Sequence, residues 1–328
     1  VSGNTVLGES ALDASVSGGE NTAIGKSALT ALTSGSSNTV VGASCGDAVT
    51  TGSDNTAMGV SAFGTNTTGA NNTAIGRAAL FANETANNNT AVGYHALQDN
   101  TASNNAAVGY GALKENTTGT QNVAVGASAL DANTTADNNT ALGAFAASGV
   151  TTGADNTAVG RASLFTNTTG SNNTAVGKDA LTNATTASSN TAVGKDALLN
   201  NTTGHSNVAV GANALDANTT ANHNTAIGLN ALGANIDGLA NTAVGSGALD
   251  ASTTADNNTA VGFNSLGANT TGSSNVGLGY EALAANTTAS NNTAVGLSAL
   301  LANTTGEQGT AVGSLAGAAI TTGDRNTF

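Results

Sequence analysis

The chain repeats one pattern of apolar and polar positions along its length. A glycine closes a block such as "NTAVG" nineteen times, and seventeen of the eighteen intervals between these glycines are 17 residues long. The exception is the 16-residue step from Gly93 to Gly109. Two-helix repeats need roughly 33 to 47 residues, so this period favours one coil of a β-solenoid. The pattern predicts an all-β fold, a parallel β-solenoid or β-roll, with residues 1–328 forming a single continuous repeat domain of about nineteen coils.

Two rows of large apolar residues predict the core of the coil. The residue directly before each glycine is aliphatic or Met in all nineteen copies, and the fourth residue after it is Leu in fifteen. The first row includes Val41, Val159, Val176, Val193 and Val210, and the second includes Leu130, Leu164, Leu181, Leu198 and Leu215. Three coils replace this Leu by Gly46, Ala147 and Gly317 and carry Val49, Val150 and Ile320 three residues later. The exchange keeps the core volume roughly constant, as a packed interior requires.

The expected strand at 157–159 is apolar on both faces. Neighbouring residues of a strand point to opposite sides, and here the small Ala158 is followed by Val159. Because a strand that is apolar on both sides is usually covered on both sides, one face would pack inside the coil and the other against a partner. The pattern therefore predicts a homo-oligomer, a trimer in the first place, or coils stacked end to end.

An asparagine stands four residues before the glycine in eighteen of the nineteen copies, with Gly309 as the exception. Stacked identical Asn side chains can bond to their neighbours in adjacent coils, and Asn tolerates the backbone conformations of a corner. The predicted Asn ladder includes Asn156, Asn173, Asn190, Asn207 and Asn224. The "NTTG" and "NTTA" segments are expected to form the second corner, where Gly69 or Gly170 can adopt a positive φ.

The composition agrees with a narrow core. Only 8% of the residues are charged and 3% aromatic, whereas 39% count as hydrophobic. A disordered chain would have no need for so strict a register. The single Cys45 occupies a position usually held by Ala and is expected to be buried. The formal net charge of −13 argues against nucleic acid or an anionic membrane as the main partner, and no apolar run is long enough to insert into a membrane.

No residue is predicted to be catalytic, to bind a cofactor or to ligate a metal. His95, His205 and His223 occupy different parts of the coil and lack Cys or His partners at metal-ligand spacing. The "GGxGxD" pattern of calcium-binding β-rolls is absent from the sequence. No nucleophile, base and orienting acid form a set, so a protein that is not an enzyme and has no cofactor is expected.

The repeat resembles those of two kinds of fibrous protein. The segments "NVAVGASALDA" (122–132) and "NVAVGANALDA" (207–217) are similar to the "SVAIGxxAxA"-like blocks in the heads of trimeric autotransporter adhesins. The full 17-residue unit, "NTAVGxxALxxNTTGxxN", looks more like the repeats of bacterial and phage proteins with tail-fibre-type domains. The adhesin resemblance covers the whole chain and implies a left-handed parallel β-roll with three chains around one axis. The adhesin repeats are generally shorter, which is a departure from that pattern.

These features favour a structural and adhesive extracellular fibre segment from a bacterial surface adhesin head, a surface filament or a phage fibre. It would lie outside the cell, on the cell surface or on a virion, and its partners would be its own copies and an unidentified surface receptor or glycan. Each end of the chain would otherwise expose core residues and an unpaired backbone edge. Each end is therefore expected to be covered by further β-structure, from a longer chain or from the next molecule of a head-to-tail filament.

The alternative function is that of an ice-binding solenoid. It rests on double threonines in the second corner, namely Thr134-Thr135, Thr168-Thr169, Thr202-Thr203, Thr270-Thr271 and Thr304-Thr305. Adjacent threonines of a strand point to opposite faces, whereas a flat row matched to ice needs Thr at alternate positions. Glu84, Ile236 and Asp237 also interrupt the row. A measurement of thermal hysteresis separates the two functions.

Overall fold

The computed structural model describes residues 3–328, and these residues form nineteen three-residue strands and no helix. The chain falls into two compact units, residues 1–162 and residues 163–328. The first unit contains β1 (Thr5–Leu7), β2 (Thr22–Ile24), β3 (Thr39–Val41), β4 (Thr56–Met58), β5 (Thr73–Ile75), β6 (Thr90–Val92), β7 (Ala106–Val108), β8 (Val123–Val125), β9 (Thr140–Leu142) and β10 (Thr157–Val159). The second contains β11 (Thr174–Val176), β12 (Thr191–Val193), β13 (Val208–Val210), β14 (Thr225–Ile227), β15 (Thr242–Val244), β16 (Thr259–Val261), β17 (Val276–Leu278), β18 (Thr293–Val295) and β19 (Thr310–Val312).

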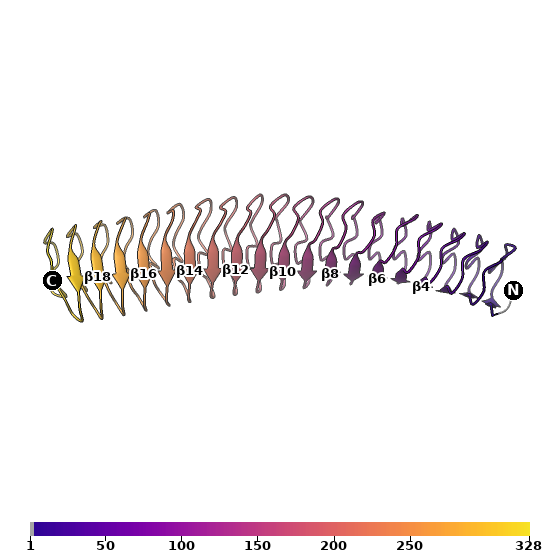
Figure 1. Ribbon diagram of the computed structural model, residues 1–328, viewed down its shortest axis with the longest axis horizontal. Coiled ribbons are helices and arrows are strands. Elements are labelled where there is room, and N and C mark those ends of the chain that lie inside the picture. Colours follow the sequence, from indigo (N-terminus) through magenta and orange to yellow (C-terminus); the bar gives the residue numbers. More distant parts are fainter. Residues whose placement is uncertain (1–2) are drawn as a thin grey trace. The chain divides into compact units, whose positions relative to one another are not determined.

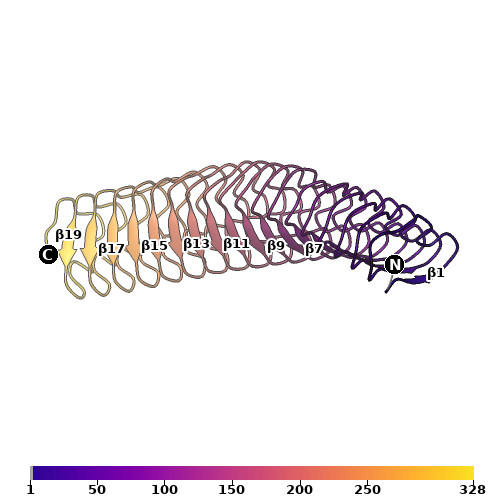
Figure 2. The same ribbon diagram turned by 45° about the vertical axis from the view of Figure 1, so that its right-hand side comes forward.

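Each coil contributes one strand, and within each unit consecutive strands pair in parallel (Figures 1 and 2). The pairing is in register: each residue of β11 lies opposite the residue 17 positions later in β12. The N–H of Gly194 donates to the carbonyl of Val176 in the preceding coil at 2.8 Å. The 16-residue step keeps the register between β6 and β7, because the missing residue falls in a corner, where "NTA" (100–102) replaces "NTTA". The expected parallel β-solenoid is confirmed.

Small and branched apolar side chains fill the interior of each coil. In the coil of Gly194, Ala192 of β12 and the later Ala197 and Leu198 have no exposed surface. The five leucines named from the sequence are all fully buried: Leu130, Leu164, Leu181, Leu198 and Leu215. Since neighbouring strands of a sheet lie ~4.8 Å apart, the leucines of successive coils stack on one another. They form a narrow apolar column along each unit.

The prediction that the aliphatic row before the glycine belongs to the core is wrong. The residues concerned are half-buried on the outer face of the sheet: Val41, Val159, Val176, Val193 and Val210. The residue one position earlier, such as Ala175 beside Val176, is fully buried instead. The physical reason is the width of the coil. A leucine from the opposite segment already fills the close-packed interior, which leaves the strand room for little more than a methyl group.

In the coil of Gly42 the interior is also filled, but the large side chain comes from the strand and the small one from the segment after it. This coil carries Gly46 in place of the core leucine, and its strand carries Val40 in place of alanine. Val40 and Val49 are both buried, and a Cβ atom added to Gly46 would lie 3.4 Å from the side chain of Leu29. Larger side chains from the strand and the corner therefore occupy the volume that the missing leucine leaves.

The Asn row before the strands forms a buried chain of hydrogen bonds. The named members Asn156, Asn173, Asn190, Asn207 and Asn224 are all buried. The N–H of Asn207 donates to Oδ1 of Asn190 at 3.0 Å, and its Nδ2 donates to the carbonyl of Ala221 at 2.8 Å. Where Gly309 replaces the asparagine, its N–H still donates to Oδ1 of Asn292 at 2.8 Å. The side chain of Asn190 thus bonds the next backbone N–H, and that of Asn207 satisfies a corner of its own coil, as buried polar groups usually do. Nδ2 of Asn89 is an exception and lies buried without a partner.

A second Asn ladder lies at the other corner and was not predicted. It uses the asparagine of the "NTTG" and "NTTA" segments, seven residues after the glycine. Nδ2 of Asn218 donates to Oδ1 of Asn201 at 2.8 Å, and Nδ2 of Asn201 donates to the carbonyl of Gly204 at 2.9 Å. Val49 and Val150 interrupt this ladder in the repacked coils. The two ladders hold the two corners of the coil.

The chain turns after each strand through residues with positive φ. Gly194 has a φ of +139° and Leu198 a φ of +52°. A branched L-residue rarely adopts such a φ, and it persists only where the surroundings impose it. Here the burial of the leucine side chain imposes it. At Gly228 a Cβ atom would lie 2.5 Å from the carbonyl oxygen of Gly245 in the next coil, so only glycine fits at the end of the strand.

Candidate functional site

The outer side of the sheet presents two parallel rows of side chains, which we call the strand face. It consists of the first and third residues of each strand, such as Thr191 and Val193 in β12. The third residues are apolar and at least partly exposed, and Met58, Leu142 and Ile227 are among the most exposed. The hydroxyls of strand threonines such as Thr191 make no hydrogen bond within the described chain. The strand face is therefore a regular apolar and hydroxyl surface whose polar groups are available to a partner or to water.

The Thr-Thr corner differs from the strand face, because its first threonine is used within the fold. Oγ1 of Thr185 donates to the carbonyl of Thr202 at 3.1 Å, and Oγ1 of Thr202 donates to that of Thr219 at 3.1 Å. The second threonine of the pair, such as Thr186 or Thr203, is exposed. In the double threonine row that suggested ice binding, only the second threonine of each pair forms a regular outward row. The first threonine of each pair bonds within the fold.

The residue directly after each glycine varies from coil to coil, and we call these positions the variable row. Five of the seven Lys and Arg residues occupy it, namely Lys26, Arg77, Arg161, Lys178 and Lys195. All three tyrosines of the chain, Tyr94, Tyr110 and Tyr280, also lie there. Lys178 pairs with Asp179 at 3.0 Å, and Lys195 pairs with Asp196. Charged and aromatic side chains are rare in this chain, so their concentration on one row marks it as a surface that differs chemically from the invariant rows.

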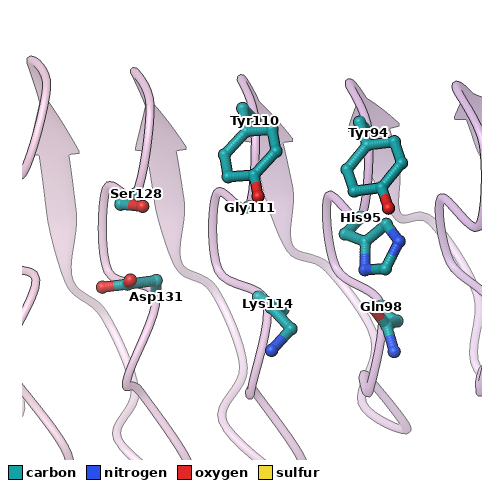
Figure 3. Close-up of a pocket in the computed structure, with 8 residues that line it drawn as sticks. All are labelled: Tyr94, His95, Gln98, Tyr110, Gly111, Lys114, Ser128 and Asp131. Atoms are coloured by element: carbon teal, nitrogen blue, oxygen red, sulfur yellow. The ribbon is translucent and has the colours of Figure 1, made fainter.

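A hollow of about 460 Å³ lies along the variable row of the first unit. Figure 3 shows that its walls come from three consecutive coils, which follow β6, β7 and β8. The rings of Tyr94 and Tyr110 lie at its upper edge with 5.5 Å between their centroids and 3° between their planes. The ring of His95 stacks on Tyr94 at 3.9 Å. Gly111 leaves space between the walls, because a Cβ atom there would meet nothing closer than 3.9 Å.

Polar groups form the lower wall of the hollow (Figure 3). Lys114 lies 3.6 Å from Glu115, which balances its charge. Asp131 accepts a hydrogen bond of 2.6 Å from Ser148 of the next coil. Oε1 of Gln98 is buried and has no hydrogen-bond partner. A buried acceptor without a partner is costly.

Among residues 3–328, no group of three or more His, Cys, Asp or Glu side chains could hold a metal ion. Cys45 is buried, and desolvation by burial raises the pKa of its thiol to about 12, so the thiol stays protonated and unreactive at neutral pH. Burial likewise raises the pKa values of Asp216 and Asp250.

Two of the three histidines, which occupy different positions of the repeat, are brought together by the stacking of coils. The rings of His205 and His223 approach edge to face, with 5.4 Å between their centroids. They occupy neighbouring positions of adjacent coils, and the N–H of His223 donates to the carbonyl of His205 at 3.3 Å. The two histidines are 18 residues apart, one more than the 17-residue period, so they do not occupy the same position of the repeat. Spacing in the sequence therefore gave no sign of this contact.

Neither a known protein-family model nor a curated protein matches the sequence. The structure describes no helix that could cross a membrane in residues 3–328. The likeness to adhesin-head and tail-fibre repeats therefore rests on the repeat motif itself.

Proposed function

We propose that this chain is a structural and adhesive segment of an extracellular fibre, and that copies of it associate through the strand face. The observation that carries the proposal is the in-register repetition of one outer surface, with its aliphatic row at least partly exposed in β2 to β10 and β11 to β19. A surface of this kind has no single reactive point. It offers the same contact at every coil, which suits extended association and load bearing.

Burial of the aliphatic row gives the physical reason for association. Each Val193-like side chain still exposes apolar surface that another copy could remove from water, at a gain of about 25 cal/mol per Å². Because the row is in register within each unit, two or three copies can bring many such residues into contact at once. A trimer around one axis satisfies all three strand faces equally, as symmetric oligomers do. The surroundings of such a fibre would be the outside of a cell or a virion.

Light scattering on the soluble chain tests the proposal. One chain has a mass of 31.2 kDa, and we expect about three times that mass at physiological salt. Replacing Val176, Val193 and Val210 together by Lys should give the monomer, because an unpaired charge is costly to bury in an interface. The coil should remain folded, since these side chains point outward.

The matched control replaces Thr169, Thr186 and Thr203 by Lys in the same region of the chain. These three residues lie at the Thr-Thr corner and are exposed, so their replacement should leave the mass unchanged. A monomeric native chain would overturn the proposal. Loss of the oligomer in the control but not in the valine variant would show that the corner is the interface instead.

A second candidate function, ice binding, is favoured by the alternation on the strand face. Thr and an aliphatic residue alternate there at positions one and three, so both rows point outward from a regular sheet. The Thr-Thr corner lacks that arrangement. A monomer that produces thermal hysteresis at micromolar concentration, and loses it on replacement of Thr174, Thr191 and Thr225 by Lys, would replace the fibre proposal. An oligomer without thermal hysteresis would remove ice binding.

A further inference from the structure

The aromatic residues at the hollow are not needed for the core. The chain has nine aromatic residues, three Tyr and six Phe, and the fully buried one is Phe63 among those described. Tyr94 and Tyr110 are 40% and 64% exposed. Other coils carry Ala or Ser at the same position, as at Ala127 and Ser246. The fold therefore does not require aromatic side chains on this row.

The ring of Tyr110 stacks on that of Tyr94, which belongs to the neighbouring coil. The two rings are parallel within 3°, and Figure 3 shows them side by side above the hollow. The guanidinium of Arg77 lies 5.9 Å from the centre of the Tyr94 ring, on the neighbouring coil. His95 stacks on Tyr94. These contacts hold Tyr94 in place and limit the entropy it loses when a ligand binds.

Hydrogen-bonding groups of both kinds lie below the rings. Lys114 supplies donors and Asp131 supplies acceptors. The cations Arg77 and Lys114 are offset by Glu115 and Asp131, so the hollow has no strong excess of either charge. Aromatic surface combined with a few convergent polar groups is the general composition of a binding site for a small molecule.

We infer that this hollow binds a neutral carbohydrate chain, with a pyranose ring against the exposed ring of Tyr110, which the stack of Tyr94 and His95 supports. A pyranose has an apolar face of C–H groups and a rim of hydroxyls that both donate and accept. The apolar face suits the tyrosine ring, and the rim suits the polar wall. Nucleic acid shares the affinity for aromatic rings but is disfavoured by the net charge of −13.

This inference deepens the adhesive part of the proposed function, because it names the class of surface molecule that the segment would hold. The two proposals fail separately. Self-association depends on the strand face and is read as a mass, whereas carbohydrate binding depends on the variable row and is read as ligand contact. A monomer that binds sugar, or an oligomer that does not, distinguishes them.

Saturation-transfer NMR on the full chain provides the test. The probes are hexasaccharides of β-1,4-linked glucose, β-1,3-linked glucose, β-1,4-linked N-acetylglucosamine, α-1,4-linked glucose and β-1,4-linked mannose. We expect at least one to bind, with little dependence on salt. Tyr110→Ala should weaken its binding about ten-fold, whereas Tyr110→Phe should preserve it, because the ring makes the contact. Leu229→Ala, on the same row without an aromatic neighbour, should have no effect.

A second pair of variants blocks the hollow without touching the rings. Gly111 has a φ of +61°, and other coils carry Asn at the equivalent position, as at Asn213 and Asn230. Gly111→Asn should therefore fold and abolish binding, whereas Gly247→Asn, at the equivalent position of the second unit, should leave binding unchanged. Binding of none of the five probes would overturn the inference, and so would binding that survives both Tyr110→Ala and Gly111→Asn. Circular dichroism of each variant confirms that the coils remain folded.

Discussion

Gly245→Ala should strongly destabilise the second unit. Gly245 has a φ of +138°, and a Cβ atom there would press on the carbonyl oxygen of Gly262 and lie 2.6 Å from its carbonyl carbon. The neighbouring backbone cannot move away without breaking the parallel pairing of β15 and β16. Backbone strain and the steric clash add together, so we expect a loss of about 4 kcal/mol or more in the free energy of unfolding. Chemical denaturation measures it.

Gly247→Ala is the matched control, two residues later in the same coil. Its φ of +68° is also positive, but a Cβ atom would meet nothing closer than 3.7 Å. The substitution therefore introduces only the cost of placing Ala in the left-handed region, about 1 kcal/mol. Similar losses for the two variants would show that the coils can separate at Gly245, and that close stacking of backbones is not what selects glycine there.

The period and the invariant rows were enough to predict the class of fold. A 17-residue repeat that keeps Asn, Ala, Gly and Leu in fixed places cannot be satisfied by two helices, and the strands appear where "TAV" predicted them. The leucine row was also identifiable, because Gly46 and Ala147 are compensated by Val49 and Val150. Such compensation keeps the volume of the core constant. It therefore identifies residues that pack together, which periodicity alone does not.

The inner face of the strand was assigned incorrectly. The alternation of side chains along a strand defines two faces, but it does not say which face lies inside the coil. Val176 is larger and more apolar than Ala175, so size favoured Val176 for the core. The structure encloses Ala175 instead. The sequence does contain a signal for this in the Gly42 coil, where the core Leu is lost and Ala becomes Val40. A change that compensates the loss of a core residue must itself face the core.

The hollow beside Tyr94 and Tyr110 could not be predicted from the repeat. It depends on residues that depart from the consensus in three successive coils, and these lie up to 37 residues apart, from Tyr94 to Asp131. Repeat analysis discards such residues as variation. Yet stacking of coils brings the same position of neighbouring repeats side by side, so a cluster on one row is a surface patch. In a solenoid, a site made of residues that depart from the repeat is found by comparing the same position in consecutive coils. It is not found by looking for residues that are close in the sequence.

Leu198→Ala should cost about 2 to 5 kcal/mol of stability, because the buried column of leucines cannot close around the cavity that is left. Leu198 has no exposed surface and a φ of +52°, and its backbone N–H donates to Ala214 in the next coil at 3.0 Å. Alanine keeps that hydrogen bond and the same backbone strain. The difference therefore reports the packing of the side chain, and the midpoint of chemical denaturation measures it with little change in slope.

Leu199→Ala is the control with the same chemical change one residue later, where the side chain is only partly buried. It should cost about 1 kcal/mol or less, since the residue can be truncated without a cavity.

Val193→Ala extends the comparison to the strand face. If the strand face is an interface between copies, Val193→Ala should weaken association at low protein concentration while the isolated chain keeps its stability. Equal losses for Leu198→Ala and Leu199→Ala would mean that the leucine column is not the core. A loss for Val193→Ala in the isolated chain as large as that for Leu198→Ala would return the valine row to the interior.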